Sequence, residues 1–144
     1  MALDDPFNLQ RFVDAQAGAY PRALAELRAG RKTSHWIWYV FPQLRGLGFS
    51  EASQFYGLSG IEEAQAYLAH ATLGPRLRAC VGAMLAGVGN AAEAVLGPTD
   101  ALKFRSSMTL FGRAAPQDTL FCQALTRFFN GEADPKTLQL LGER

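Results

Sequence analysis

A lone histidine lies among aromatic residues in one short stretch of the chain, residues 34–41, which read SHWIWYVF. Imidazole is the side chain that exchanges protons near neutral pH, so His35 is the candidate catalytic residue, as a general acid or base. The rings of Trp36 and Trp38 could stack on a flat group of a ligand, as aromatic rings do on bases. The alternative is that this stretch is simply buried core, because clustered aromatic residues usually pack together.

Cations and hydroxyl groups are concentrated in a second stretch, residues 100–111, which read DALKFRSSMTLF. A helix there would turn Phe104, Met108 and Phe111 toward the core and leave the polar side chains on its other sides. Cations and hydroxyls spaced by three or four residues could hold a phosphate or a carboxylate. The candidate ligand-binding residues of this stretch are Lys103, Arg105, Ser106 and Ser107. In the alternative interpretation it is a solvated helix face with exposed cations.

A further candidate cation stands at the start of a predicted helix. Arg76 follows Gly74 and Pro75, and a positive charge in a first helical turn is opposed by the helix dipole at a cost of up to ~1 kcal/mol. Arg76 could therefore face an anion bound at this helix end, whereas the alternative is a surface charge or an ion pair. His70, at the end of the preceding predicted helix, is expected to be a cation that favours that helix end.

The elements that position these residues are all expected to be helices. Start signals, stop signals and apolar residues three and four positions apart recur along the chain, and no run alternates apolar and polar residues. We predict separate helices at about 9–17 and from Pro21 to Gly30, a helix in the aromatic stretch capped by Ser34, and a capping box between Ser59 and Glu62. Further helices are predicted after Ser50, after Gly74, from Thr99 or Asp100 to about Gly112, from Pro116 and after Asp134.

These signals predict an all-α fold. With 144 residues and 49% hydrophobic residues, the chain is long enough to bury its own core. We therefore expect residues 1–144 to form a single compact domain of eight to nine short helices in irregular, orthogonal packing.

Composition and spacing argue against several classes of function. The net charge is +1 and the basic residues are scattered, so we expect no nucleic-acid partner. The longest apolar run is too short to span a bilayer, so we expect no membrane association. Two histidines and two cysteines without ligand spacing predict no metal site, and no dinucleotide or phosphate-loop motif indicates a cofactor. Cys80 and Cys122 fall in predicted helices, as buried free thiols would, which favours a cytoplasmic location.

Three motifs together resemble a known family. They are residues 34–50 (SHWIWYVFPQLRGLGFS), 67–77 (YLAHATLGPRL) and 100–111 (DALKFRSSMTLF), followed by a phenylalanine-rich helix. This combination, over residues 11–141, resembles the family called domain of unknown function 1810, some members of which carry the label calpastatin-like. The resemblance implies a compact all-α domain from bacteria or fungi without an assigned activity. It also marks positions for attention, namely Ser34, His35, Trp36, Trp38, Phe41, Pro42, Gln43, Ser50, Arg76, Lys103, Arg105, Ser106, Ser107 and Thr109.

The label calpastatin-like implies inhibition of a calcium protease, and the composition does not support it, because such inhibitors are disordered and rich in charge. We expect instead a small anionic, nucleotide-like ligand in a cleft between the His35–Trp38 segment and the Lys103–Thr109 helix. Ser34, Trp36, Trp38, Gln43, Arg76 and the polar residues of 103–107 would bind it. Two alternatives remain open. One is a non-enzymatic module that binds a protein or a second copy of the chain. The other is a hydrolase or transferase in which Ser106 or Ser107 is the nucleophile and His35 its base.

Overall fold

The predicted all-α class is confirmed in the computed structural model, which describes residues 5–87 and 91–142. Within those ranges the chain forms nine helices and one isolated bridge, between Leu44 and Leu58. The helices are α1 (Gln10–Ala29), α2 (Ile37–Val40), α3 (Glu51–Phe55), α4 (Ile61–Ala69), α5 (Leu73–Ala86), α6 (Ala92–Leu96), α7 (Pro98–Ala114), α8 (Thr119–Phe129) and α9 (Pro135–Leu140).

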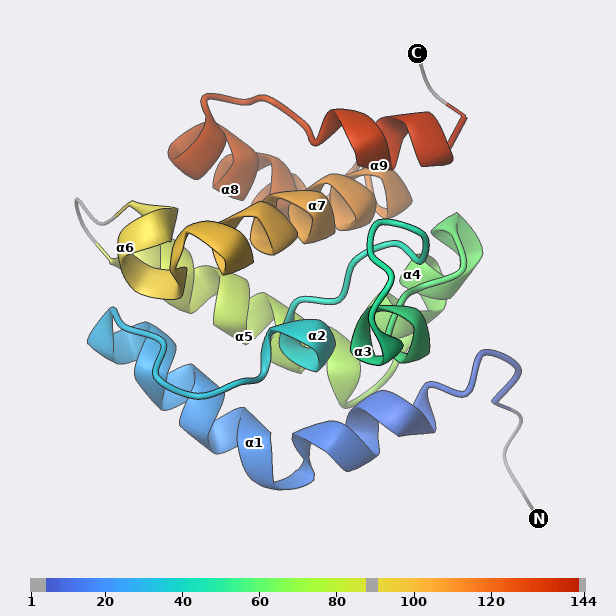
Figure 1. The fold of residues 1–144 in the computed structure, drawn as a ribbon, viewed down its shortest axis with the longest axis horizontal. Coiled ribbons are helices and arrows are strands. Elements are labelled where there is room, and N and C mark those ends of the chain that lie inside the picture. Colours follow the sequence, from blue (N-terminus) through green and yellow to red (C-terminus); the bar gives the residue numbers. More distant parts are fainter. Residues whose placement is uncertain (1–4, 88–90, 143–144) are drawn as a thin grey trace.

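Helix α7 is the central element of the arrangement. It packs against α8 and α9 on one side and against α2, α4 and α6 on the others (Figure 1). Its predicted apolar stripe is confirmed, because Phe104, Met108 and Phe111 are fully buried. The ring of Phe41, just after α2, meets that of Phe104 edge-on with centroids 4.8 Å apart. The aromatic stretch and the polar stretch of the sequence are therefore neighbours.

The prediction of two helices before residue 30 is wrong, because α1 runs unbroken from Gln10 to Ala29 with Pro21 inside it. Proline removes one backbone hydrogen bond and clashes with the preceding turn, which bends a helix without necessarily ending it. Figure 1 shows α1 bent near its middle. Packing along α5 compensates for the lost bond, and α1 ends as expected at Gly30, whose φ is 79°.

The aromatic stretch forms only one helical turn. Trp36 precedes α2 in the chain. The predicted cap of this helix by Ser34 is absent, because the start of α2 receives no hydrogen bond from a side chain. Trp36, Ile37, Val40 and Phe41 are all buried, whereas His35 is exposed and Trp38 is half-buried. The stretch is therefore mostly core, with two side chains left at the surface.

Some of the predicted helix caps and helix starts are present in the structure, and others differ. Ser50 accepts a hydrogen bond from the backbone of Ser53, and Asp134 accepts one from Thr137, so both of these helix starts are confirmed. The capping box at Ser59 uses Glu63 in place of Glu62. Helix α8 begins after Asp118, not at Pro116.

His70 lies at the end of α4, as predicted, and its ring also contacts the start of the next helix. Its Nδ1 accepts hydrogen bonds from the backbone N–H groups of Thr72 and Leu73, at 3.1 and 3.2 Å. His70 therefore joins the end of α4 to the start of α5.

The two cysteines are free, and they differ in exposure. Cys80 is buried in the interface of α5 with α1, and burial raises the pKa of its thiol to about 12. Cys122 lies on the exposed side of α8, so the expectation that both thiols are buried is wrong for this residue.

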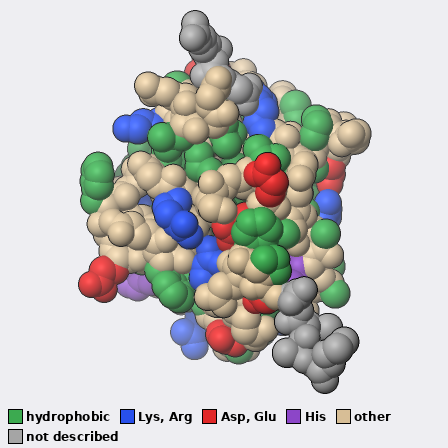
Figure 2. All heavy atoms as spheres, turned by 90° about the vertical axis from the view of Figure 1, so that its right-hand side faces the viewer, with side chains coloured by type: hydrophobic (Ala, Val, Ile, Leu, Met, Phe, Trp, Pro, Cys, Tyr) green, Lys and Arg blue, Asp and Glu red, His purple; other side chains and the backbone are tan. Residues whose placement is uncertain are grey.

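Helices α3 and α4 lie toward one side of the molecule in Figure 1, and Figure 2 views that side directly. Its hydrophobic side chains form separate groups, divided by charged and neutral polar surface. Among the described residues, no helix combines the length and the apolar character needed to cross a membrane.

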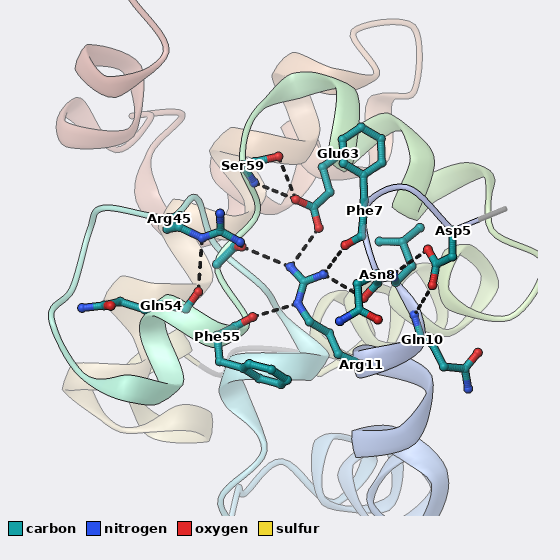
Figure 3. Close-up of polar contacts among 12 residues, drawn as sticks. Asp5, Phe7, Asn8, Gln10, Arg11, Arg45, Gln54, Phe55, Ser59 and Glu63 are labelled. Atoms are coloured by element: carbon teal, nitrogen blue, oxygen red, sulfur yellow. Dashed lines mark hydrogen bonds and ion pairs between the residues drawn. The ribbon is translucent and has the colours of Figure 1, made fainter.

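A buried ion pair joins four segments of the fold (Figure 3). Arg11 and Glu63 contact at 2.8 Å, with both side chains almost completely buried. Each of the five guanidinium N–H groups has an acceptor. These acceptors are Glu63 and the carbonyls of Phe7, Asn8, Phe55 and Gly57. The other oxygen of Glu63 accepts from the backbone N–H and the hydroxyl of Ser59.

Because this network is fully satisfied, we predict that Arg11→Lys lowers the free energy of unfolding by about 2 to 4 kcal/mol. Lysine keeps the charge but offers three donors in place of five, so buried carbonyls lose their partners. Chemical denaturation measures the change. Arg45→Lys is the matched control, since exposed Arg45 also bonds to the carbonyls of Gln54 and Gly57 and should lose less than about 1 kcal/mol. Equal losses in the two variants would contradict the prediction.

Candidate functional site

The polar atoms at the start of the aromatic stretch converge on one buried carboxylate, that of Glu26. Its Oε1 accepts from the backbone N–H groups of Thr33 and Ser34, at 2.8 and 3.0 Å, and from Trp36 Nε1 at 2.9 Å. Its Oε2 accepts from the Ser34 hydroxyl at 2.6 Å. Burial raises the pKa of Glu26, but the hydrogen bonds from Ser34, Thr33 and Trp36 outweigh it and lower the pKa to about 2.

This network gives Ser34 and Trp36 a structural role. The Ser34 hydroxyl donates to Glu26, and the Trp36 ring is 1% exposed and therefore closed to a ligand. Both residues hold the loop before α2 against α1. Two of the predicted binding residues are thus turned toward the interior.

Four other predicted residues do line one surface depression, between α2, the loop after it and α7. They are Trp38, Gln43, Lys103 and Ser106. The remaining lining comes from Leu47, Gly48, Thr99, Leu102, Asp134 and Lys136. The depression is open to solvent and combines an aromatic ring, two leucines, an amide, hydroxyls and two lysines. We call it the Gln43 depression.

Electrostatic contacts fix Lys103 at its edge. Asp100 lies between two lysines, with Lys32 Nζ 2.9 Å from one carboxylate oxygen and Lys103 Nζ 3.1 Å from the other. Burial raises the pKa of Asp100, but the hydrogen bonds from the two lysines outweigh it, and the pKa lies below its ordinary value. Lys103 also lies over the ring of Trp38, 4.7 Å from its centroid. Lys136 makes no ion pair with any other described residue.

The side-chain amide of Gln43 has no hydrogen-bond partner among the described residues, although Gln43 is only 8% exposed. Among the described residues, Ser107 Oγ is the only fully enclosed side-chain polar atom that lacks a hydrogen-bond partner. The Gln43 amide also lacks a partner, so its atoms cannot be fully enclosed and must reach the open space of the depression. Gln16 is a direct contrast. It is 2% exposed, yet its amide nitrogen donates to Tyr39 and Tyr67 and its oxygen accepts from Arg76.

His35 lies outside the Gln43 depression. It lines a different depression, with Ala19, Arg22, Thr33, Ser34, Trp36 and Tyr39. Its imidazole makes no hydrogen bond to another described residue, and only its backbone carbonyl accepts, from the Tyr39 hydroxyl. His35 precedes α2, so the helical spacing that would have placed it beside Trp38 does not apply. The two depressions have no lining residue in common.

The remaining candidates are engaged in the fold. Arg76 bonds to Gln16 at 3.4 Å and lies over the ring of Tyr20. Arg105 donates to the carbonyls of Glu132 and Ala133, beyond the end of α8. Ser107 is fully buried. Thr109, also buried, donates to the Arg105 carbonyl and accepts from the backbone of Asp134, and so ties α7 to the start of α9.

Sequence reasoning missed several residues of the two clusters, namely Glu26, Lys32, Leu47, Thr99, Asp100, Leu102, Asp134 and Lys136. Lys136 carried a usable signal, since a cation in a first helical turn, here just after Asp134 and Pro135, is opposed by the helix dipole. Glu26 carried no such signal in the sequence, because its hydrogen-bond partners lie across a turn whose geometry is set by tertiary packing.

A small all-α domain with an open polar depression beside its central helix is the class that these observations define. The description "protein of unknown function (DUF1810)" belongs to a family whose profile matches residues 6–141. The chain belongs to that family. A crystal structure of the conserved hypothetical protein Rv1873 from Mycobacterium tuberculosis is similar, with a TM-score of 0.94 and 51% sequence identity, covering 97% of this chain and 100% of the other. None of the curated proteins matches the sequence significantly.

The Glu26 network gives a pH-dependent prediction. A carboxyl with a depressed pKa stabilises the fold fully above its unfolded value near 4.5, and this contribution is lost as the pH falls through about 2. Glu26→Gln should therefore lower the free energy of unfolding by about 1 to 3 kcal/mol at pH 7, because the amide keeps the shape without the charge. The difference from the unmodified protein should shrink toward pH 2.

Denaturant titrations at several pH values measure this effect. Glu93→Gln, which changes an exposed glutamate on α6, is the control and should leave stability nearly unchanged at every pH. A Glu26→Gln deficit that stays constant from pH 7 to pH 2 would show that the charge of Glu26 is not what the hydrogen bonds stabilise.

Proposed function

We propose that the protein binds a small anionic ligand, one that carries a flat group, in the Gln43 depression. The observation that carries the proposal is the side-chain amide of Gln43, to which no described residue bonds although Gln43 is only 8% exposed, at a depression that opens to solvent. A ligand in the depression that bonds to this amide replaces water there, and a hydrogen bond of this kind contributes about 0.5 to 1.5 kcal/mol.

The charges around the depression favour an anion. Asp100 is already neutralised by Lys32, and the Asp134 carboxylate accepts from the backbone N–H and the hydroxyl of Thr137. Lys103 and Lys136 outnumber Asp134 among the charged lining residues, so the lining carries a net positive charge. The Ser106 hydroxyl donates to the carbonyl of Leu102, as helix serines often do, and keeps lone pairs that can accept from a ligand.

The apolar part of the lining suits a flat group. Leu47, Leu102 and the ring of Trp38 border the depression. Lys103 covers one face of the Trp38 ring, so a flat group would contact the two leucines and the rest of that ring. This division into one apolar wall and one cationic edge fits a ligand with both characters.

The proposal predicts that phosphorylated ligands stabilise the protein against heat. At a hundred times its dissociation constant, a ligand adds ~2.7 kcal/mol, which for a domain of this size raises the melting temperature by roughly 5 to 10 degrees. Thermal-shift titrations with pyrophosphate, ribose 5-phosphate and nucleoside monophosphates measure this. Lys136→Ala should weaken binding about tenfold, because it removes a cation that no described residue neutralises.

The matched control is Arg31→Ala, which removes an exposed cation outside the depression. It should leave the affinity unchanged, and neither variant should lose measurable stability without ligand. No shift with any of these anions, or equal weakening by the two variants, would refute the proposed anion site.

A second candidate function is supported by exposed apolar side chains at the same place. Phe49 is 91% exposed directly after Gly48, which lines the depression, and Leu102 is 62% exposed. Apolar side chains gathered at the surface can mark a protein-binding site, including one for a second copy of the chain.

If this surface binds a second copy of the chain, sedimentation velocity should show self-association that Phe49→Ser abolishes. A monomer at all concentrations, with and without the substitution, would exclude self-association through this surface.

A further inference from the structure

We infer that the ligand presents a hydrogen-bond donor and an acceptor side by side on a flat ring, as the edge of a nucleobase does, and that Gln43 binds this edge. The inference rests on the proposed function and specifies its ligand. A carboxamide offers an N–H donor and a carbonyl acceptor on neighbouring atoms. Adenine, with its amino group next to a ring nitrogen, has the complementary pair, and a glutamine or asparagine amide binds it through two bonds.

The backbone of Gln43 is held in place by a short pairing with a distant segment. Its carbonyl accepts from Leu58 N–H at 2.9 Å, and the Leu58 carbonyl accepts from Arg45 N–H at 2.8 Å. Leu44, between them, forms the isolated bridge with Leu58, and both leucines are buried. Pro42 restricts the backbone on the other side. The amide is therefore presented from a fixed point and not from a mobile loop.

Gln43 is unusual among the glutamines of the described chain. Gln16, the other buried one, is bonded through both atoms of its amide, and Gln10, Gln54, Gln65 and Gln123 each donate to a protein acceptor. Gln117 and Gln139 are exposed to water. Only Gln43 among them is both nine-tenths buried and unpaired. Its amide thus has space and bonding capacity that the fold itself does not use.

The rest of the depression provides for the other parts of a nucleotide. Leu47 and Leu102 can contact the faces of the base, while Lys136 and Lys103 can meet the phosphate. A purely anionic metabolite would use only the second set. The contribution of the base is therefore what distinguishes a nucleotide from a sugar phosphate at this site.

Calorimetric titrations of the full chain with AMP, GMP, UMP and ribose 5-phosphate test this inference. At least one nucleotide should bind ten times or more as tightly as ribose 5-phosphate. Gln43→Met, which keeps the length of the side chain and removes the amide, should abolish that preference, so that the nucleotides bind no more tightly than ribose 5-phosphate. Gln43→Glu, which has acceptors only, should favour GMP over AMP relative to the unmodified protein, because guanine offers two adjacent donors.

Gln117→Leu is the control for loss of an amide at an exposed site, and it should change nothing. The two levels of the proposal fail differently. If ribose 5-phosphate binds as tightly as every nucleotide, or if Gln43→Met weakens both to the same extent, the site binds anions but the base-recognition inference is overturned. If none of the four ligands binds, the proposed function fails and the inference fails with it.

Discussion

The carboxylate of Glu26 determines how the aromatic stretch lies on the rest of the protein. A charge buried in the interior must be satisfied, and here four hydrogen bonds from Thr33, Ser34 and Trp36 do so. These bonds draw Trp36 inward, and the single turn of α2 then leaves Trp38 on the side that faces α7. The edge-on contact of Phe41 with Phe104 fixes the same arrangement from the core side. The Gln43 depression exists because these contacts bring the two stretches together without filling the space between them.

The arginines and the lysines of the protein are used in different ways. Arg11, Arg45, Arg105 and Arg127 donate to backbone carbonyls at the ends of helices and in loops, where their several N–H groups satisfy acceptors that the helices leave open. Lysines supply the cationic edge of the depression, at Lys103 and Lys136. The guanidinium groups of these four arginines thus stabilise the fold, while the ammonium groups of Lys103 and Lys136 and one unpaired amide lie at the depression, where a ligand could reach them.

The sequence predicted those features that depend on neighbours along the chain. The stripe of Phe104, Met108 and Phe111 and the caps at Ser50 and Asp134 follow from spacing within one helix, and all were confirmed. The Arg11–Glu63 pair could not be predicted, because its partners are far apart in the sequence. The residues around Arg11 in the sequence also do not distinguish it from an arginine that is exposed. Likewise, the continuity of α1 through Pro21 depends on its packing against α5. His35 was expected in one cleft with Trp38, but the helix begins after His35 and the two side chains line different depressions. Gln43 became a candidate binding residue only through the resemblance to a family, because nothing in the adjacent residues of the sequence indicates an unpaired amide.

The most direct measurement is the nuclear magnetic resonance spectrum of the glutamine side-chain amides, recorded while AMP is added to the ¹⁵N-labelled protein. If Gln43 binds the base, its two amide proton signals shift strongly and saturably, because they gain an acceptor that the free protein lacks. The amide signals of Gln16, which is already bonded through both atoms, stay in place. Saturable shifts confined to residues around His35 and Arg22, with the Gln43 amide unmoved, would place the ligand in the other depression and contradict the account.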